Sequence, residues 1–382
     1  MKVLICVRSL DKGGAEMLDC RLAVELNKLG IQTDIAAQYS KKFNGRIETN
    51  SWLKKGVLNV HYLNSDFKFG VFHAIYYLIK INNLHKYDAI ISTNSGLDTY
   101  VVVVKFLKNS FQHIIGFHTY PNTAILNSLR VIIWKKILHR ANGYFFISDF
   151  VRRKVESLLE IYSDYSSVIY NSYNPSSNRN LKVNIREEFD LNPKTEIILL
   201  IGRIESRKGF DIAIKASVEL IKNKDVVILI VGEEYQGYAI ENGLYGYLSE
   251  LETIIKSLKI EEKVIFCGYR TDVVNIMRQA DVLVHLARHE GFGIVLLEAI
   301  EAGLPIVASD RGGIPEVLEK TPYRTFSLDD RIEISNEIEK MLNMPEFEKI
   351  RIIEKAKEGL SFYTDSRRAR EFEIFIKELV NA

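Results

Sequence analysis

Residues 196–209 have the sequence EIILLIGRIESRKG, in which an apolar run ends in a glycine turn and continues into a helical pattern. The run Glu196–Ile201 has the β-branched composition of a strand inside a parallel sheet. The turn Gly202–Gly209 then places Arg203 and Lys208 at the carboxyl end of that strand. Two cations there predict a diphosphate site, since each charge-assisted hydrogen bond contributes about 1.5–3 kcal/mol. A solvated basic loop is the alternative interpretation.

The same alternation of strand and helix patterns extends along the chain and predicts two doubly wound α/β domains. The expected strands are Val3–Val7, Thr33–Ala37, Val57–Tyr62, Ala89–Ser92, His113–Phe117, Gly143–Ile147, Ser167–Tyr170, Glu196–Ile201, Val226–Val231, Val264–Cys267, Val282–His285 and Ile306–Ala308. The clearest expected helices are Ala15–Leu29, Ile125–Arg140, Ile294–Ala302 and Arg367–Val380. We expect an N-terminal domain at 1–172, a polar linker at 173–194, a C-terminal domain at 195–362 and a helix at 363–382 that packs back on the N-terminal domain.

A second strand-to-helix turn, Glu290-Gly-Phe-Gly-Ile-Val-Leu-Leu-Glu298, follows another expected strand. Gly293 opens a helix whose first N–H groups are suited to phosphate. Glu290 and Glu298 carry carboxylates that can accept hydrogen bonds from sugar hydroxyls. The alternative is an acid at a helix start and an ordinary surface glutamate. Ser309–Glu316 repeats the order of strand, glycine turn and helix, so that three such turns lie in one domain.

The N-terminal domain offers two weaker candidates. Ser9-Leu-Asp-Lys-Gly-Gly-Ala-Glu16 lies between the first strand and the first helix, where Gly13 and Gly14 let the backbone approach an anion. A tight turn that binds nothing is the alternative. His118 follows the strand His113–Phe117 at its carboxyl end, although a packed or surface histidine is the commoner case. The chain lacks the GxGxxG and GxxxxGK[ST] patterns here, which disfavours dinucleotide enzymes and P-loop NTPases.

Length and composition restrict the class of protein further. The chain has 382 residues, enough for two cores, and its three cysteines (Cys6, Cys20 and Cys267) have no metal-binding spacing. They indicate a reducing compartment. The first apolar run is too short for a secretion signal, and no apolar stretch approaches the roughly 20 residues of a membrane span. We therefore expect a cytoplasmic protein without a nucleic-acid partner.

Charge is divided unevenly between the two halves of the chain. Residues 1–170 contain 22 Lys and Arg against 13 Asp and Glu, a net +9, whereas residues 171–382 contain 29 against 36, a net −7. The basic residues Arg130, Lys135, Lys136, Arg140 and Arg152–Lys154 lie on helical patterns. They predict contact with an anionic surface, such as the inner face of a membrane. A core helix with a solvated basic face is the alternative.

Four blocks together resemble the retaining GT-B glycosyltransferases of family 4: GRIESRKG at 202–209, ADVLVHLARHEGFGIVLLEA at 280–299, GLPIVASD at 303–310 and GGIPE at 312–316. The resemblance spans nearly the whole chain and implies two Rossmann-like domains with an interdomain cleft. It implies transfer of a hexose or hexosamine, with retention, from a nucleoside diphosphate sugar to a hydroxyl group. A UDP-sugar is the expected donor. The expected acceptor is a lipid-linked or oligosaccharide intermediate of bacterial surface polysaccharide synthesis.

The resemblance also implies which residues form the site. The donor would be bound by Gly13, Gly14, Arg203, Lys208, Gly268, Tyr269, Glu290, Gly291, Phe292, Gly293, Ile294, Val295 and Glu298. The catalytic group would comprise His118, Arg203, Lys208 and Glu290. Arg203 and Lys208 would hold the diphosphate, Glu290 the transferred sugar and Glu298 the ribose, with His118 beside the sugar and the acceptor. No metal and no cofactor besides the donor substrate are expected.

Departures from the family and two rival functions remain open. Leu286-Ala287 stands where the family often has Pro-Ser, and the loop Glu233–Tyr247 is longer than the family leads us to expect. A nucleotide-sugar epimerase of GT-B architecture could use the same phosphate turns without an acceptor. A non-catalytic nucleotide-sugar-binding protein would need Arg203 and Lys208 but would gain nothing from His118.

Overall fold

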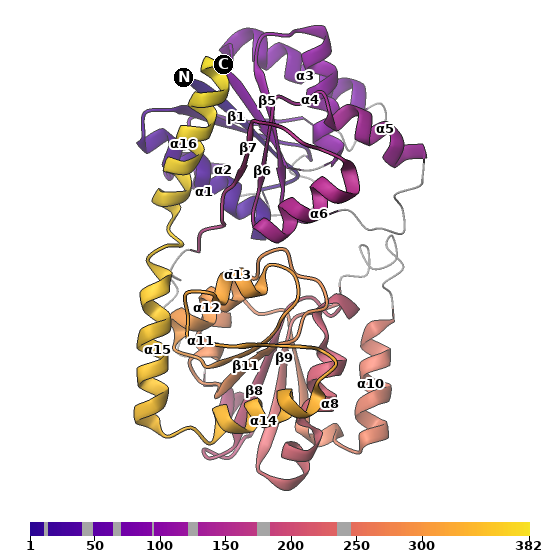
Figure 1. The fold of residues 1–382 in the computed structure, drawn as a ribbon, viewed down its shortest axis with the longest axis vertical. Coiled ribbons are helices and arrows are strands. Elements are labelled where there is room, and N and C mark those ends of the chain that lie inside the picture. The colour runs from indigo at the N-terminus through magenta and orange to yellow at the C-terminus, as the bar shows by residue number, and fades with distance from the viewer. Residues whose placement is uncertain are drawn as a thin grey trace. The chain divides into compact units, whose positions relative to one another are not determined.

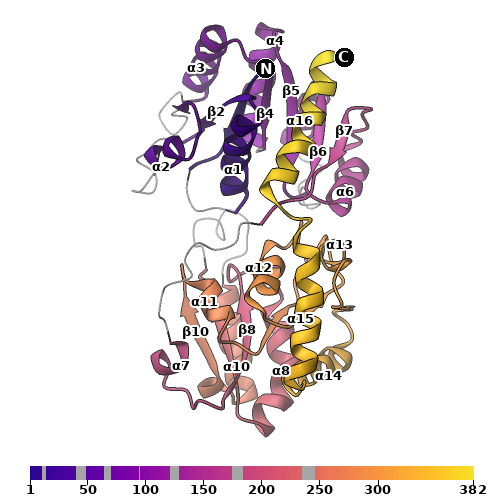
Figure 2. The same ribbon diagram turned by 90° about the vertical axis from the view of Figure 1, so that its left-hand side faces the viewer.

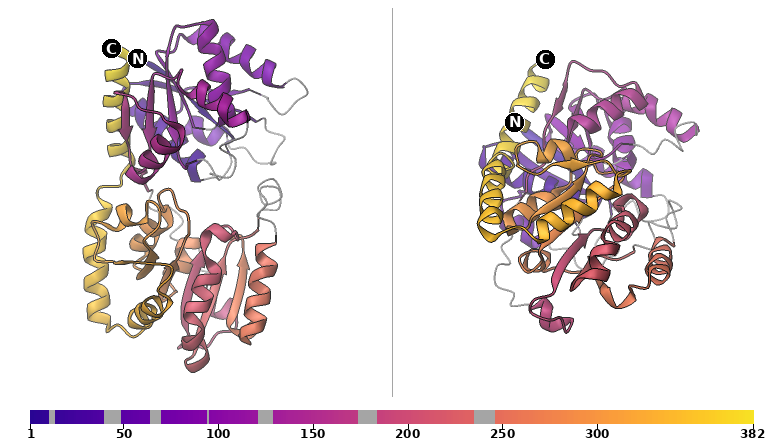
Figure 3. Two further views of the ribbon diagram at one scale, coloured as in Figure 1. Left: turned by 45° about the vertical axis from the view of Figure 1, so that its right-hand side comes forward. Right: turned by 60° about the horizontal axis from the view of Figure 1, so that its bottom comes forward.

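The computed structural model describes residues 1–10, 14–39, 49–63, 70–93, 95–120, 129–173, 184–234 and 246–382. The chain divides into two compact units, one of Met1–Ser172 with Tyr363–Ala382 and one of Tyr173–Phe362 (Figure 1). Each unit consists of a parallel sheet with helices packed around it (Figures 2 and 3). This architecture confirms the predicted α/β class with two doubly wound sheets.

Over the described residues the first sheet has seven parallel strands in the order β3-β2-β1-β4-β5-β6-β7. They are β1 (Lys2–Val7), β2 (Gln32–Ala37), β3 (Val60–Tyr62), β4 (Ala89–Ser92), β5 (Gln112–Phe117), β6 (Gly143–Phe146) and β7 (Ser166–Val168). The chain adds β2 and β3 on one side of β1 and then places β4 on the other side. Ligands of doubly wound sheets bind at such a reversal, beyond the carboxyl ends of the strands.

The helices of the first unit are α1 (Gly14–Lys28), α2 (Thr49–Lys54), α3 (Gly70–His85), α4 (Ser95–Leu107), α5 (Leu129–Leu138), α6 (Asp149–Leu159) and α16 (Asp365–Asn381). The last of these, α16, packs against α1 (Figure 2). Its buried side chains, which include Phe372, Phe375 and Leu379, recur at the spacing of one helical face. The N-cap of α16 is Thr364, whose hydroxyl accepts a hydrogen bond from the N–H of Arg367 at 3.2 Å. The C-terminal segment thus completes the unit that the N-terminus began.

The second sheet, over the same described part of the chain, has six parallel strands in the order β10-β9-β8-β11-β12-β13. They are β8 (Glu196–Ile201), β9 (Val226–Val231), β10 (Val264–Gly268), β11 (Val282–His285), β12 (Ile306–Ser309) and β13 (Thr325–Phe326). The helices are α7 (Ile185–Glu188), α8 (Phe210–Asn223), α10 (Tyr247–Leu258), α11 (Val273–Met277), α12 (Ile294–Ala302), α13 (Ile314–Leu318), α14 (Arg331–Leu342) and α15 (Glu346–Leu360). Here the strand order reverses between β8 and β11.

The structure differs from the sequence prediction at a few short elements. Strand β3 begins at Val60, three residues later than expected, because it is an edge strand that pairs only with β2. The two-residue strand β13 was not predicted, since so short a run carries no periodicity. Helix α7 lies inside the predicted linker, where the side chain of Asn184 accepts hydrogen bonds from the first helical N–H groups. The start of the predicted helix Ile125–Arg140 lies outside the described residues.

None of the described helices combines the length and the apolar character needed to cross a bilayer.

Candidate functional site

Two loops meet where the strand order of the second sheet reverses. The loop Gly202–Gly209 follows β8, and the loop Leu286–Gly293 follows β11, which pairs with β8. Gly209 has a φ of +66°, and a Cβ atom there would lie 1.9 Å from the carbonyl oxygen of Leu286. Because only glycine fits this approach of two backbones, the last residue of GRIESRKG is dictated by the contact between the loops.

The centre of this site is an ion pair between the two loops. The Nζ of Lys208 lies 2.7 Å from Oε2 of Glu290, and both side chains are 17% exposed. The Nε2 of His285, at the end of β11, lies 3.3 Å from the same oxygen. Burial alone would raise the pKa of Glu290, but the charge of Lys208 and the contact with His285 offset burial and hold that pKa well below its ordinary value. Burial lowers the pKa of His285, so the pair consists of a carboxylate and an ammonium beside a neutral imidazole.

The glycines of the GGIPE block hold the backbone of Glu290 in place. The N–H of Gly313 donates to the carbonyl oxygen of Glu290 at 2.9 Å. Gly312 has a φ of +68°, and a Cβ atom there would lie 2.0 Å from the same carbonyl oxygen. The hydroxyl of Ser309 donates to the carbonyl of Ala287 at 2.8 Å. This block, which the sequence suggested as a further ligand turn, supports the loop that carries the carboxylate.

Helix α12 begins directly after the Glu290 loop. Its N-cap is Gly293, with a φ of +95°, a backbone conformation that residues other than glycine rarely adopt. The first amides of an α-helix, here those of Ile294 and Val295, have no acceptor within the helix and lie at its positive end. Phe292 is buried beneath this turn, whereas Glu298 is half-buried one turn further along α12. The arrangement suits an anion at the start of α12.

Arg203 belongs to a charged network in the loop after β8. Its guanidinium lies 3.7 Å from Oε1 of Glu205, and its side chain is 48% exposed. Arg207 contacts the same carboxylate oxygen at 2.5 Å. Arg288, from the loop after β11, donates to both carboxylate oxygens of Asp211 at 2.8 Å. The network fixes the loop Gly202–Gly209 while the guanidinium of Arg203 remains accessible to solvent.

Gly268 and Tyr269, which are predicted to bind the donor, lie at the same edge of the sheet. Gly268 ends β10 with a φ of +65°, and its carbonyl accepts a hydrogen bond from the N–H of Gly232 at 2.9 Å. A Cβ atom on Gly232 would lie 1.9 Å from the carbonyl oxygen of Gly202, so the loops after β9 and β8 are also in close contact. Tyr269 is 57% exposed. The sheet thus places the loops after β10, β9, β8 and β11 in one row, which carries the predicted residues of the second unit.

In the first unit, His118 lies beside a buried carboxylate. Its Nε2 lies 3.4 Å from Oδ2 of Asp19, a residue of α1 that is 1% exposed. The same carboxylate accepts a hydrogen bond from the hydroxyl of Thr93 at 3.0 Å. Arg368 of α16 lies 3.1 Å from Oδ1 of Asp19 and donates to the carbonyl of Leu18 at 2.7 Å. Burial would raise the pKa of Asp19, but His118 and Arg368 offset burial and lower it.

Sequence reasoning missed the partners of His118. In the sequence, Asp19 is one polar residue of the helical pattern Ala15–Leu29, and Arg368 is one of several charged residues of the helical pattern Arg367–Val380. A signal was present, because Arg368 shares a helical face with Phe372 and Phe375, where a charge needs a partner. The identity of that partner, 349 residues away, was not predictable.

The predicted glycine turn after β1 is only partly described. Gly14 is the first residue of α1 and is exposed, and a Cβ atom there would meet nothing within 4 Å. Packing within the unit therefore does not require glycine at this position, which leaves room for an approaching ligand. Gly13 lies outside the described residues. Among the described residues of the predicted site, Gly14 and His118 belong to the first unit and the others belong to the second.

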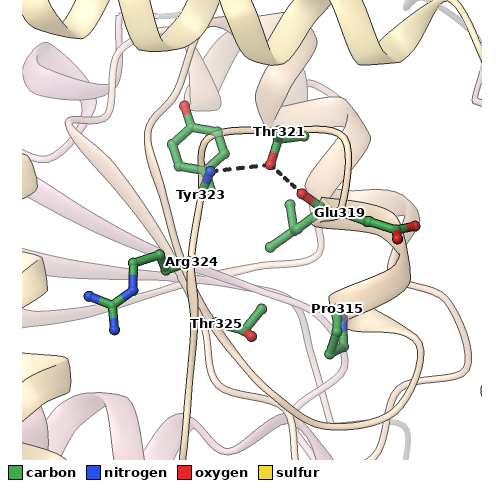
Figure 4. A pocket seen from close by; sticks show the side chains of 7 residues that line it. Pro315, Glu319, Thr321, Tyr323, Arg324 and Thr325 are labelled. Carbon is green, nitrogen blue, oxygen red and sulfur yellow. Dashed lines mark hydrogen bonds between the residues drawn. The ribbon is translucent and has the colours of Figure 1, made fainter.

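A separate pocket of about 360 Å³ lies between α13 and β13 in the second unit (Figure 4). It is lined by Pro315, Leu318, Glu319, Thr321, Tyr323, Arg324 and Thr325. The hydroxyl of Thr321 donates to the carbonyl of Leu318 at 2.7 Å and accepts from the N–H of Tyr323 at 3.3 Å. These bonds close the turn that leads into β13. No residue of the predicted donor site is among those that line this pocket.

Comparison with known proteins identifies the family of the chain. The model of the glycosyltransferase family 4 matches residues 12–177, and that of the glycosyl transferases group 1 matches residues 182–359. An uncharacterized glycosyltransferase of Methanocaldococcus jannaschii is 29% identical over 181 residues, 45% of this chain and 43% of that protein. N-acetyl-alpha-D-glucosaminyl L-malate synthase of Bacillus anthracis is 26% identical over 135 residues, 35% of this chain and 32% of that enzyme. The chain thus matches less than half the length of these relatives.

Solved structures share the fold over almost the full chain. A glycosyltransferase of Rickettsia africae has a TM-score of 0.79 at 18% identity, covering 99% of this chain and 98% of that one. HepE of Anabaena, in complex with UDP and glucose, has a TM-score of 0.77 at 18% identity, covering 99% of this chain and 100% of that one. At these identities the likeness establishes the fold, which is the GT-B fold expected from the sequence. Because the two family models match both halves of the chain, this chain belongs to the group 1 glycosyltransferases of glycosyltransferase family 4.

Proposed function

We propose that the protein is a retaining glycosyltransferase that moves a hexose or hexosamine from a UDP-sugar to a hydroxyl group. The observation that carries the proposal is the 2.7 Å ion pair between Lys208 and Glu290, at the strand reversal between β8 and β11. A cation for the diphosphate and a carboxylate for sugar hydroxyls lie side by side there. The complex of HepE with UDP and glucose supports a uridine nucleotide as the donor.

The chemistry follows from where charge develops. As the bond between sugar and diphosphate breaks, the leaving diphosphate becomes more negative, and Lys208, Arg203 and the first amides of α12 would stabilise it. In this proposal these groups do the work without a metal. Glu290 stays ionised because its pKa is held low, so its oxygens accept hydrogen bonds from the sugar. His118, oriented by Asp19, would lie beside the transferred sugar and the acceptor.

Nucleotide binding should be detectable as thermal stabilisation. We expect UDP and UDP-sugars, in the presence of EDTA, to raise the melting temperature, because a ligand at 100 times its Kd adds about 2.7 kcal/mol to the free energy of unfolding. GDP, ADP and their sugars serve as matched controls. Stabilisation by GDP-sugars alone would contradict the uridine donor, and no stabilisation by any nucleotide would contradict the proposed site.

The product of the reaction separates the two rival functions from transfer. A transferase releases UDP only in step with the glycosylation of an added acceptor. Conversion of one UDP-sugar into another without an acceptor would instead establish a nucleotide-sugar epimerase. Tight binding with neither product, over a panel of donors and hydroxyl acceptors, would establish a nucleotide-sugar-binding protein.

The proposed acceptor is a lipid-linked or oligosaccharide intermediate of surface polysaccharide synthesis, reached at an anionic membrane surface. Lys136 and Arg140 on and after α5 are exposed, which supports such a contact. Lys135 contacts Glu160 at 3.2 Å, and Arg152 contacts Asp149 at 2.5 Å, so part of the basic cluster is already neutralised. We expect weak binding to vesicles that contain anionic lipid, lost at high salt, in a co-sedimentation assay. Equal binding to neutral vesicles would contradict an electrostatic contact.

A further inference from the structure

A group of two histidines and one carboxylate lies in the first unit and shares no residue with the candidate donor site. Asp34 is on β2, His61 is on β3 and His85 is the last residue of α3. His61 pairs in register with Ala36, so His61, Ala36 and Asp34 lie on the same face of the sheet. That face is covered by α3, because Ala36 shares a hydrophobic cluster with Ala74 and Leu78 of this helix. The end of α3 brings His85 to the two strand residues.

The three side chains converge on one point. One ligand atom from each lies within 4.8 Å of the other two. The Nε2 of His61 lies 3.8 Å and the Nδ1 of His85 lies 3.9 Å from Oδ2 of Asp34. These separations are too long for direct hydrogen bonds. Around a cation bound at about 2.0–2.2 Å from each ligand, these atoms would lie slightly closer to one another. A small movement of the side chains would bring them to that spacing.

Outer hydrogen bonds hold the carboxylate in position. The hydroxyl of Tyr87 donates to Oδ2 of Asp34 at 2.6 Å, and Nδ2 of Asn59 donates to Oδ1 at 3.0 Å. Asp34 is 4% exposed, whereas the side chains of His61 and His85 are 12% and 25% exposed. The group therefore has a fixed anionic ligand on its inner side and two imidazoles that solvent can reach.

We infer that Asp34, His61 and His85 form a binding site for a divalent transition-metal ion, with Zn²⁺ as the best match. Imidazole nitrogens with one carboxylate suit Zn²⁺, Co²⁺ and Ni²⁺, whereas Mg²⁺ and Ca²⁺ require a shell of oxygen ligands. Three protein ligands leave a fourth position for water on the exposed side. The bound ion would join the edge strand β3 and the end of α3 to β2.

This site is independent of the proposed transfer reaction. Tyr87 lies just before β4, so the cluster is placed toward the amino-terminal ends of the strands, whereas His118 follows the carboxyl end of β5. Its role is to brace the fold, and its loss would leave nucleotide binding by the second unit in place. The sequence predicted no metal site in the chain, and residues 34, 61 and 85 follow no metal-binding spacing that would have indicated one.

The test is a calorimetric titration of the EDTA-treated, desalted full chain with ZnCl₂, repeated with CoCl₂ while the visible absorption is recorded. We expect one Zn²⁺ per chain and a rise in melting temperature on binding. His61→Gln and His85→Gln should each weaken binding by at least about 100-fold, more than the loss of an outer-shell partner causes. His73→Gln is the matched control, because His73 lies on α3 and stacks on Tyr77 without belonging to the three ligands.

The outcomes are separable from those of the donor site. Failure of the wild-type chain to bind Zn²⁺ more tightly than His85→Gln would overturn the metal site and identify the group as a network of polar side chains without an ion. If His61→Gln and His85→Gln both bind Zn²⁺ as tightly as the wild-type chain, the ion binds elsewhere and the proposed metal site is wrong. Stabilisation by UDP, measured with EDTA in His85→Gln, reports on the donor site alone.

Discussion

Replacing Lys208 with alanine should lower the turnover of sugar transfer by roughly 10²–10³-fold, the loss expected when one preorganised donor to a developing charge is removed. The ammonium lies 2.7 Å from Glu290, so this ion pair holds it beside the carboxylate proposed to bind the sugar. The substitution would also leave the buried carboxylate of Glu290 without its main partner. We therefore expect kcat to fall more than KM rises, as measured by UDP release in the presence of acceptor.

A control separates this effect from a general loss of charge or stability. Lys222 lies on the exposed face of α8, the helix that follows Lys208, and Lys222→Ala should leave turnover unchanged. Thermal unfolding of both variants shows whether the fold is kept. If Lys208→Ala is folded and turns over at nearly the wild-type rate, the assignment of this lysine to the leaving diphosphate is wrong.

Replacing Arg368 with methionine should lower the free energy of unfolding of the first unit by about 3–5 kcal/mol, because the buried charge of Asp19 loses its arginine partner. Both side chains are 1–2% exposed, and Arg368 lies 3.1 Å from Asp19. Methionine keeps most of the volume of the arginine stem, so loss of the ion pair dominates over loss of packing. Urea denaturation followed by circular dichroism measures the change.

Two further variants test this explanation. Arg370→Met, on the exposed side of the same helix, should change the free energy of unfolding by less than about 0.5 kcal/mol. In the double variant Asp19→Asn/Arg368→Met no charge is left buried, so part of the lost stability should return. If the double variant is less stable than the sum of the two single changes predicts, the ion pair is not the source of the effect.

The parts of the fold that the sequence predicted best are the central strands. Strands β8, β9 and β11 have the predicted bounds, since each is a continuous β-branched run between turns and is buried on both faces. Edge elements were less predictable, because β3 and β13 are short and depend on pairing with one neighbour. The order of the strands was not readable from local patterns either. It decides that β8 and β11 are neighbours and hence which loops meet.

The sequence predicted the residues of the candidate site but not the contacts between them. Arg203, Lys208 and Glu290 came from motifs that follow strands, and the sheet places them at one edge. The direct bond between Lys208 and Glu290 could not be foreseen, because the two residues are 82 positions apart. The requirement for glycine at Gly209 and Gly312 also became clear only from the backbones that approach them. Local patterns thus predict where chemistry lies, whereas tertiary contacts decide what each residue does.

The pairing of α16 with α1 has a consequence for how the protein is made. During synthesis the chain emerges from its N-terminus, and domains tend to fold as they appear. The first unit can form its sheet early, but Asp19 waits for Arg368, which follows the whole of the second unit. In a nascent chain the buried carboxylate of Asp19 therefore lacks its arginine partner until α16 leaves the ribosome. A chain that stops anywhere in the second unit would lack Arg368 and would leave the first unit without this partner of Asp19.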